Sequence, residues 1–318
     1  MRRDAFRHEL LEYANGADGF VTRTLPYISL ALAADEPVLV AVTGGKAASL
    51  REALEGEVDR VRFTDMQELG RNPGRIISAW RDLLEQHLRR ARGVLGIGEP
   101  IWPGRSAEEL TECHRHETLL NLAFDGGRPW HLLCPYDVDS LDDQVIEAAK
   151  RSHPFVAGDR DVADEATHTH LRPPGVRDPL GGALPPPGAP TQELTFSEAD
   201  LVTLRHTLKD WSMRERLDPD AVQELVLAVN ELATNSVRYG GGEGRLVLWR
   251  QHDTLICEVH DAGHIEDPLI GRARPAPDQH SGRGLWLVHE LCDLVQIRSS
   301  AAGTAIRVHK RRAASDER

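Results

Sequence analysis

The sequence predicts two domains of different class: an N-terminal α/β domain with a largely parallel sheet, and a C-terminal α+β two-layer sandwich. The first observation is length, because 318 residues exceed one ordinary core and suit two domains. The second is a proline- and glycine-rich stretch over residues 171–190. The third is element order, which alternates strand and helix before that stretch but places helices ahead of strands after it.

Residues 171–190 are interpreted as a linker between domains at 1–170 and 191–318. Proline removes backbone donors and glycine raises the entropic cost of ordering, so neither helix nor sheet forms easily there. The run Pro185-Pro186-Pro187 favours a stiff, extended spacer. The alternative is a proline-rich ligand for the groove of a partner protein.

Before the linker, short apolar runs alternate with segments that carry apolar residues at helical spacing. Such buried strands, separated by helices, favour an α/β layer fold with a largely parallel sheet. Strands are expected at 37–42, 58–63, 94–97 and 130–134, and helices at 76–90, 108–124 and 141–152.

After the linker, two helices precede the strands. The first is expected over 197–216 with Ser197 as N-cap. The second starts at Asp218-Pro219, where a capping carboxylate precedes a proline in the first turn, and carries one apolar stripe. Strands are then expected at 245–250, 254–260, 295–298 and 304–309, with a helix at 285–292.

Composition limits the class of protein. Hydrophobic residues make up 40% and charged residues 28%, which is typical of a globular chain. A net charge of -12 argues against general nucleic-acid binding. The four cysteines form no CxxC pair, and neither a signal peptide nor an apolar run of about 18 residues is found, so a cytoplasmic protein is expected.

Three short motifs follow one another in the C-terminal domain. Glu231 and Asn235 stand four residues apart on the second helix and therefore share a face. Asp261-Ala-Gly263 ends a strand, and Ser281-Gly282-Arg283-Gly284-Leu285 opens a helix. Each motif alone is more often a surface pair or a turn. Together they supply a carboxylate, a hard amide oxygen and glycine turns, which a metal–nucleotide site needs.

The motifs resemble the boxes of the GHKL ATPases, the superfamily that includes gyrase, histidine kinases and MutL. Glu231-x-x-x-Asn235 resembles the N box, and Asp261-x-Gly263 and Gly282-x-Gly284 resemble the two glycine boxes. Gly303-Thr304 resembles the closing Gly-Thr. Residues 191–312 are most similar to anti-sigma-factor serine kinases, through ELATNSVRYG and GRGLWLV. The resemblance implies a Bergerat fold, the histidine-kinase-like ATPase fold.

The resemblance also implies a role for each motif residue. Glu231 is expected to be the general base, and Asn235 to coordinate Mg²⁺. Asp261 is expected to accept a hydrogen bond from the adenine amino group of ATP, with Thr304 supporting it. The glycines that let the ATP lid approach the phosphates are Gly263, Gly282 and Gly284.

One departure from the family pattern concerns the hinge of that lid. His264-Ile265 stands where the first glycine box usually continues to another glycine. Side chains at these positions stiffen the hinge, so ATP binding is a firmer expectation than phosphate transfer.

The expected function is that of a regulator with a sensing domain and a serine/threonine kinase domain. The kinase would phosphorylate an anti-sigma-factor antagonist of the STAS type, with a sigma factor as the competing partner, and kinases of this type are often homodimers. One rival is an ATP-responsive anti-sigma module without kinase activity. The other is an orphan histidine-kinase-like protein, but no acidic residue follows His206 and no phosphoacceptor hairpin precedes the N box.

Two further signals in the N-terminal domain are weak. Thr43-Gly44-Gly45-Lys46 follows a strand, but the P-loop pattern needs glycine where Val40 stands. Cysteine, histidine and glutamate gather around one helix, yet no second pair has the spacing of metal ligands, so structural or solvent-facing roles are expected. These residues are Cys113, His114, His116, Glu117 and, further on, Cys134.

Residues 1–157 resemble the MEDS sensory domain of regulators from methanogens, methylotrophs and actinobacteria. The resemblance rests on His8, Tyr13, Gly98-Glu99, Glu117 and the segment 133–137. It implies a degenerate RecA-like α/β core that binds a small-molecule ligand. A purely scaffolding role is the alternative.

Overall fold

The computed structural model describes residues 5–87, 93–127, 129–158, 169–170, 179–187, 192–275 and 282–312. The chain forms two compact units, residues 1–177 and 178–318. Among the described residues, no helix has the length and apolar character needed to cross a bilayer. The domain limits at 170 and 191 remain a prediction.

The first unit alternates strands with helices, as predicted for an α/β domain. Its elements are β1 (Arg7–Tyr13), α1 (Gly16–Ala33), β2 (Val38–Val42), α2 (Gly44–Ala53), β3 (Val61–Asp65), α3 (Met66–Leu69), α4 (Ile76–His87), β4 (Leu95–Gly98), α5 (Ala107–Ala123), β5 (His131–Asp137), α6 (Asp143–Ser152), β6 (Phe155–Val156) and β7 (Thr169–His170). Short 3-10 turns cover Glu55–Arg60 and Pro73–Arg75. The last residues of the helix predicted over 76–90 lie outside the described residues.

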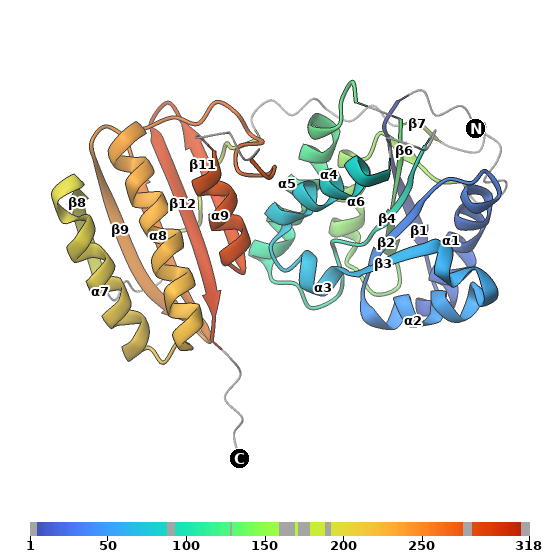
Figure 1. The fold of residues 1–318 in the computed structure, drawn as a ribbon, viewed down its shortest axis with the longest axis horizontal. Coiled ribbons are helices and arrows are strands. Elements are labelled where there is room, and N and C mark those ends of the chain that lie inside the picture. The colour runs from blue at the N-terminus through green and yellow to red at the C-terminus, as the bar shows by residue number, and fades with distance from the viewer. Residues whose placement is uncertain are drawn as a thin grey trace, which may run out of the picture. The chain divides into compact units, whose positions relative to one another are not determined.

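The sheet of the first unit has the order β3-β2-β4-β5-β1-β6-β7, and every described pairing is parallel except β6 with β7. One face packs against α1, through Phe20 and Ile28. On the other face, Trp80 of α4 lies against Gly96 and Gly98 of β4. Helices therefore cover both faces, as Figure 1 shows, and the predicted largely parallel sheet is confirmed.

Strand β1 and helix α1 are not predicted from the sequence, although β1 lies inside the sheet between β5 and β6. Its sequence, RHELLEY, has no simple apolar alternation, because three charged or titratable side chains are buried beside its leucines. Glu9 is paired with Arg7 and with His131, whose Nε2 lies 2.7 Å from Glu9 Oε2. Buried ion pairs thus conceal the strand from a hydrophobicity pattern.

The second unit is an antiparallel sheet with helices on one face, which confirms the predicted α+β sandwich. Its strand order is β11-β12-β10-β9-β8. The elements are β8 (Gln192–Ser197), a 3-10 turn (Glu198–Asp200), α7 (Leu201–Arg214), α8 (Pro219–Tyr239), β9 (Glu243–Gln251), β10 (Thr254–Asp261), α9 (Arg283–Leu291), β11 (Leu294–Ser300) and β12 (Gly303–Arg311).

The start of the helix predicted over 197–216 is corrected by the structure. Ser197 ends β8 and caps a 3-10 turn, with its backbone N–H donating to Asp200 Oδ2 over 3.0 Å, and α7 begins only at Leu201. Ser197 acts as an N-cap as predicted and forms a capping box with Asp200, but the 3-10 turn that it caps delays the start of the helix. The edge strand β8 was missed because only Leu194 and Phe196 alternate in it.

Helix α8 begins and ends as its sequence predicts. The Asp218 carboxylate accepts a hydrogen bond from the Asp220 N–H at 2.9 Å, and Pro219 occupies the first turn. The stripe with Leu225, Val229 and Leu232 is buried against the sheet. Helix α8 thereby brings its last two turns to the end of β10.

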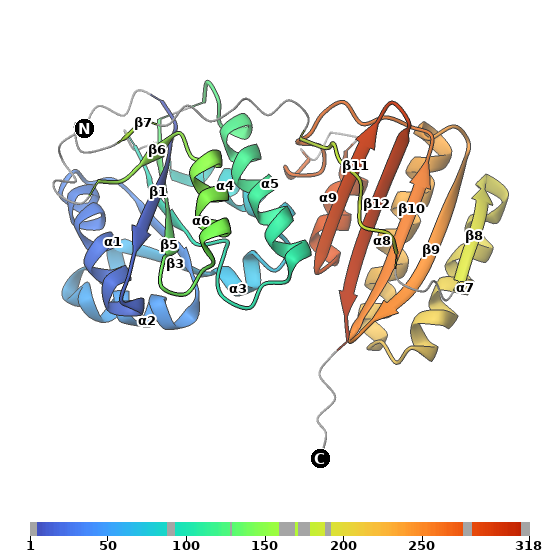
Figure 2. The same ribbon diagram turned by 180° about the vertical axis from the view of Figure 1, so that it is seen from behind.

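A short segment, residues 179–187, crosses the sheet face that the helices leave open, and we call it the strap. Figure 2 shows it passing in front of the strands. The Leu180 side chain is buried, its carbonyl accepts from the Ser299 N–H at 3.0 Å, and Arg307 Nη2 donates to the Pro185 carbonyl at 2.7 Å. These are the described residues of the predicted linker, and they belong to the second unit.

Candidate functional site

A cavity of about 450 Å³ lies between the end of α8, strands β10 and β12, and the start of α9. Its size suits a small organic ligand. Its lining combines aliphatic side chains such as Leu232, Ile270 and Leu285 with polar residues such as Asn235 and Asp261. Six of the seven residues predicted from the sequence line it: Asn235, Asp261, Gly263, Gly282, Gly284 and Thr304.

Glu231, the seventh residue, lies behind Gly284 at the edge of this cavity. A Cβ atom on Gly284 would stand 2.7 Å from Glu231 Oε2 and 3.5 Å from Asn235 Nδ2. Real Cβ atoms do not come so close to oxygen, so glycine lets the start of α9 lie directly on these two side chains. Both side chains are half-buried.

Gly282 caps the start of α9 in the left-handed conformation, with φ at 82°. Residues with a Cβ rarely adopt this conformation. The first turn of a helix presents backbone N–H groups and the positive end of the helix dipole. Since Gly282 and Gly284 line the cavity, an anionic ligand group is favoured at this end.

Both oxygens of the Asp261 carboxylate are held by the protein. Ser236 Oγ donates to Asp261 Oδ2 over 2.6 Å, and the Gly263 N–H donates to Oδ1 over 2.8 Å. Gly240 makes room for this carboxylate, because a Cβ there would lie 2.5 Å from Asp261 Cγ. The carboxylate is therefore fixed in orientation, and each oxygen retains a lone pair for a ligand donor.

Thr304 lies opposite Asp261 across β10 and β12. Its hydroxyl donates to the Gly263 carbonyl at 2.9 Å and lies 2.8 Å from Ser299 Oγ. Ser299 Oγ also accepts from the Ile265 N–H at 2.8 Å and lies 3.3 Å from His264 Nδ1. The two residues that depart from the family pattern are thus tied to β11.

Sequence reasoning missed Ser236, Gly240 and Ser299. Ser236 lies among the buried residues of α8, so its spacing indicates only packing. Its partner Asp261 is 25 residues further along the chain. Gly240 belongs to none of the three predicted motifs. A pattern read along one chain does not reveal contacts that form between distant elements.

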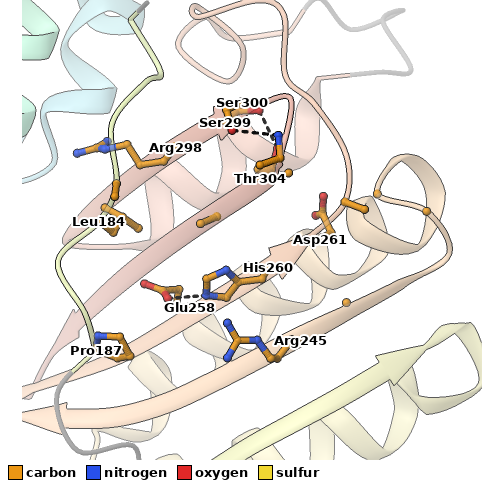
Figure 3. A pocket seen from close by; sticks show the side chains of 18 of the residues that line it. Leu184, Pro187, Arg245, Glu258, His260, Asp261, Arg298, Ser299, Ser300 and Thr304 are labelled. Carbon is orange, nitrogen blue, oxygen red and sulfur yellow. Dashed lines mark hydrogen bonds and ion pairs between the residues drawn. The ribbon is translucent and has the colours of Figure 1, made fainter.

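A second cavity, of about 800 Å³, lies on the other face of the same sheet, under the strap. Figure 3 shows Leu184 and Pro187 of the strap on one side of it, with Glu258 and His260 opposite, and Arg298 beside Leu184. Arg307 Nε donates to Glu258 Oε2 over 2.6 Å, and His260 Nε2 bonds to Oε1.

The environment of Glu258 decides its charge. Burial by itself raises the pKa of Glu258, but the His260 hydrogen bond and the Arg307 guanidinium together hold this pKa below its ordinary value. Glu258 is therefore an ionised, paired carboxylate under the strap rather than a proton donor.

In the first unit, the loop Thr43–Lys46 does not form a P-loop. Helix α2 begins at Gly44, directly after Thr43, which leaves no loop to surround a phosphate. Lys46 Nζ is paired with Glu99, and the Thr43 hydroxyl donates to Glu99 Oε2 over 3.4 Å. Burial raises the pKa of Glu99 despite the opposing effect of Lys46.

Three residues of the MEDS resemblance come together elsewhere in the first unit. His8, Glu117 and Cys134 meet in one buried cluster, and His153 completes it. Cys113 is not part of the cluster, because its thiol lies 3.4 Å from the Pro100 carbonyl. Sequence spacing could not reveal the cluster, since its members lie on four separate elements.

Family comparisons agree with this geometry. Residues 7–154 match the MEDS family, described as the "MEthanogen/methylotroph, DcmR Sensory domain". Residues 194–310 match the family described as "Histidine kinase-like ATPase domain". Among curated proteins, no match is found.

Three solved structures resemble part of the chain. The RsbU and RsbW domains of a Mycobacterium tuberculosis protein share 20% identity, with a TM-score of 0.30, over 39% of this chain and 33% of that one. The SiaB–SiaC complex of Pseudomonas aeruginosa shares 13% identity, with a TM-score of 0.32, over 38% of this chain and 89% of that one. The Acinetobacter baumannii histidine kinase AdeS shares 14% identity, with a TM-score of 0.24, over 38% and 68%.

This chain spans a third of the first of these structures. The family matches and the two folds together give the domain organisation: an N-terminal MEDS sensory domain is followed by a C-terminal histidine kinase-like ATPase domain.

Proposed function

We propose that the second unit binds Mg-ATP in the cavity between α8 and α9 and transfers the γ-phosphoryl group to a protein serine or threonine. The observation that carries this proposal is that a fixed carboxylate, Asp261, and a glycine-started helix line the same cavity. Such a cavity combines an acceptor for a base edge with a favourable place for phosphates.

The residues present suit a magnesium nucleotide. The Asn235 amide offers a hard oxygen of the kind that Mg²⁺ prefers, and Gly284 allows backbone to approach where any Cβ would collide with Glu231. Asp261 would accept a hydrogen bond from the adenine amino group, with Thr304 holding the Gly263 carbonyl beside it. Gly263, Gly282 and Gly284 would let the lid close.

Mg-ATP supplies the phosphoryl group and neutralises part of its charge. Glu231 would accept the proton of the attacking hydroxyl while that oxygen forms its bond to the γ-phosphorus. The bond from this phosphorus to the bridging oxygen breaks, and ADP leaves. The contribution of the chain is to position these groups and to hold one proton.

The substrate we propose is a STAS-type anti-sigma-factor antagonist, with a sigma factor as the competing partner. Phosphorylation adds about two negative charges to the antagonist and disrupts its contact with the ATPase domain. The MEDS domain would bind a small-molecule ligand and set this activity.

A second candidate function has one observation in its favour. His264 and Ile265 are held to β11 through Ser299, at the hinge where the lid begins. A lid held in this way favours an ATP-responsive module that sequesters a sigma factor without transferring phosphate.

The experiment combines nucleotide binding with phosphate transfer. The purified full chain is titrated with Mg-ATP by calorimetry, and is then incubated with γ-labelled ATP and a STAS-domain protein of the same organism. We expect binding and serine or threonine labelling, with labelling abolished in Glu231→Gln. Asp210→Asn, which removes an exposed carboxylate on α7 outside the cavity, is the matched control and retains both.

Each outcome of this experiment favours one candidate function. Binding without transfer to any STAS protein of the organism favours the sequestering module. Label on a histidine of the chain itself favours a histidine-kinase-like protein, for which exposed His206 on α7 is the residue to substitute. No binding of Mg-ATP contradicts the proposed site altogether.

A further inference from the structure

Four side chains of the first unit bring their donor atoms together at one buried point. They are His8 on β1, Glu117 on α5, Cys134 on β5 and His153 at the end of α6. Each is fully buried, and one donor atom from each lies within 4.8 Å of all the others. The cluster therefore has no access to bulk water that could satisfy its polar atoms.

The register of the sheet explains why His8 and Cys134 meet. Strands β1 and β5 are parallel, with His8 opposite Leu132 and Leu10 opposite Cys134. Since side chains alternate between faces, His8 and Cys134 point to the same face. Their donor atoms, His8 Nε2 and Cys134 Sγ, lie 3.4 Å apart.

The hydrogen bonds at the rim of the cluster fix both imidazoles. Asn121 Nδ2 donates to the Ser152 carbonyl at 2.7 Å, so the Asn121 oxygen faces His8 Nδ1 at 3.1 Å. The Ala149 carbonyl, which only accepts, lies 2.8 Å from His153 Nδ1. Each ring therefore carries its hydrogen on Nδ1 and directs the Nε2 lone pair into the cluster.

Inside the cluster, the Nε2 lone pairs of the two imidazoles face the Glu117 carboxylate, which is itself an acceptor. His8 Nε2 lies 2.9 Å from Glu117 Oε2, and His153 Nε2 lies 3.2 Å from the same oxygen without making a hydrogen bond. Adding a proton to each ring would place two cations side by side, with ring centroids 4.0 Å apart, against a single carboxylate. A single divalent cation among the four donors removes the conflict instead.

We propose that His8, Glu117, Cys134 and His153 form a closed, four-coordinate site for a divalent transition-metal ion, with Zn²⁺ as the best match. Tetrahedral zinc with these ligands separates its donor atoms by roughly 3.3–3.6 Å, since its bonds are about 2.0–2.3 Å long. The three separations of 2.9, 3.2 and 3.4 Å need only a small expansion.

Charge and ligand type both point to this class of ion. Two neutral imidazoles, one carboxylate and one thiolate carry two negative charges, which a divalent ion neutralises in a site without water. The Cys134 thiol releases its proton to solvent as the metal–sulfur bond forms. Sulfur and nitrogen donors select zinc or cobalt over Mg²⁺ or Ca²⁺. Asn121 and the Ala149 carbonyl supply the outer hydrogen bonds that metal-binding histidines generally make.

The test measures metal in the full chain. Protein stripped with a chelator is titrated with Co²⁺, which reports tetrahedral geometry through its visible bands and a sulfur ligand through a charge-transfer band. We expect about one equivalent bound per chain, as a closed site requires, with both signals present. Zn²⁺ added afterwards should displace the cobalt and abolish both signals.

Variants locate the site. Cys134→Ser should lose the charge-transfer band, and His153→Ala should weaken cobalt binding at least tenfold. Cys113→Ser is the matched control, because it removes a buried thiol of the same unit outside the cluster, and it should keep the full spectrum.

If a variant fails to fold, measurements on the wild-type chain still test the proposal. Chelation should lower the melting temperature of the wild-type chain, and Zn²⁺ should restore it. Folded wild-type chain that binds no Co²⁺, or a charge-transfer band that persists in Cys134→Ser, would overturn the proposal.

Discussion

The Ser236 hydroxyl donates to Asp261 Oδ2 over 2.6 Å, so helix α8 orients a carboxylate that lines the cavity between α8 and α9. Because Asn235 lies beside Ser236 on the same helix turn, one element positions both Asn235 and Asp261. A displacement of this turn would therefore disturb both proposed contacts of the nucleotide at once.

Ser236→Ala should weaken Mg-ATP binding without unfolding the domain. The carboxylate loses one of its two orienting hydrogen bonds, which is worth about 1 kcal/mol or roughly fivefold in Kd. Calorimetric titration measures the change. Ser212→Ala is the control, because Ser212 is also buried and donates to a carbonyl of its own helix, Leu208, at 2.8 Å, but lies outside the cavity. Equal losses in both variants would contradict the orienting role.

Gly284→Ala should reduce phosphate transfer more than nucleotide binding. The new methyl group would stand 2.7 Å from Glu231 Oε2, so the carboxylate has to move. Misplacing a catalytic group by about 1 Å costs on the order of 10²-fold in rate. A double-mutant cycle checks the cause: with Glu231→Ala already present, Gly284→Ala should have little further effect on ATP affinity. If Gly284→Ala lowers ATP affinity as much in the Glu231→Ala background as in the wild type, the contact with Glu231 is not the cause.

The stability of the second unit should depend on pH through Glu258. Its pKa lies below the ordinary value of 4.5, because the His260 hydrogen bond and Arg307 outweigh burial. Such a group stabilises the fold above pH 4.5, and this contribution is lost as pH falls through the lowered pKa. Glu258→Gln should lower the unfolding free energy at pH 7 by about 1.5–3 kcal/mol. The difference in unfolding free energy between variant and wild type should become smaller in acid, as measured by urea unfolding at each pH. A difference that does not change with pH would contradict the lowered pKa of Glu258.

Leu180→Ala should destabilise the second unit, because the strap anchors itself with this buried side chain. Removing a buried leucine costs about 2–5 kcal/mol when the space does not collapse. Leu227→Ala, at an exposed position of α8, should cost less than about 0.5 kcal/mol. Chemical unfolding of both variants decides whether the strap is part of the folded unit.

The sequence predicted both fold classes well, because their signals are local. The N-cap Asp218, the proline after it and the apolar stripe of α8 all act within one helix. The same holds for the left-handed glycine that starts α9. By contrast, β1 was missed because its buried charges are balanced by partners that are distant along the chain, such as His131.

The candidate site was predictable only in part, for the same reason. The motif residues share short spacings, and the structure places them around one cavity. Ser236 and Gly240 act through Asp261, and Ser299 acts through Thr304 and Ile265, so their roles appear only once the strands are paired. The His8–His153 cluster likewise depends on strand register, which no single segment encodes.

The strap also behaves as an intramolecular ligand of the sheet it crosses. The histidine kinase-like family match begins at residue 194, so a fragment cut there would lose Leu180 and the carbonyl that Arg307 holds. Tethering gives such a segment a high effective concentration, which a free peptide does not share. Because the strap covers this face of the sheet, a competing peptide could bind there only after the strap dissociates from it.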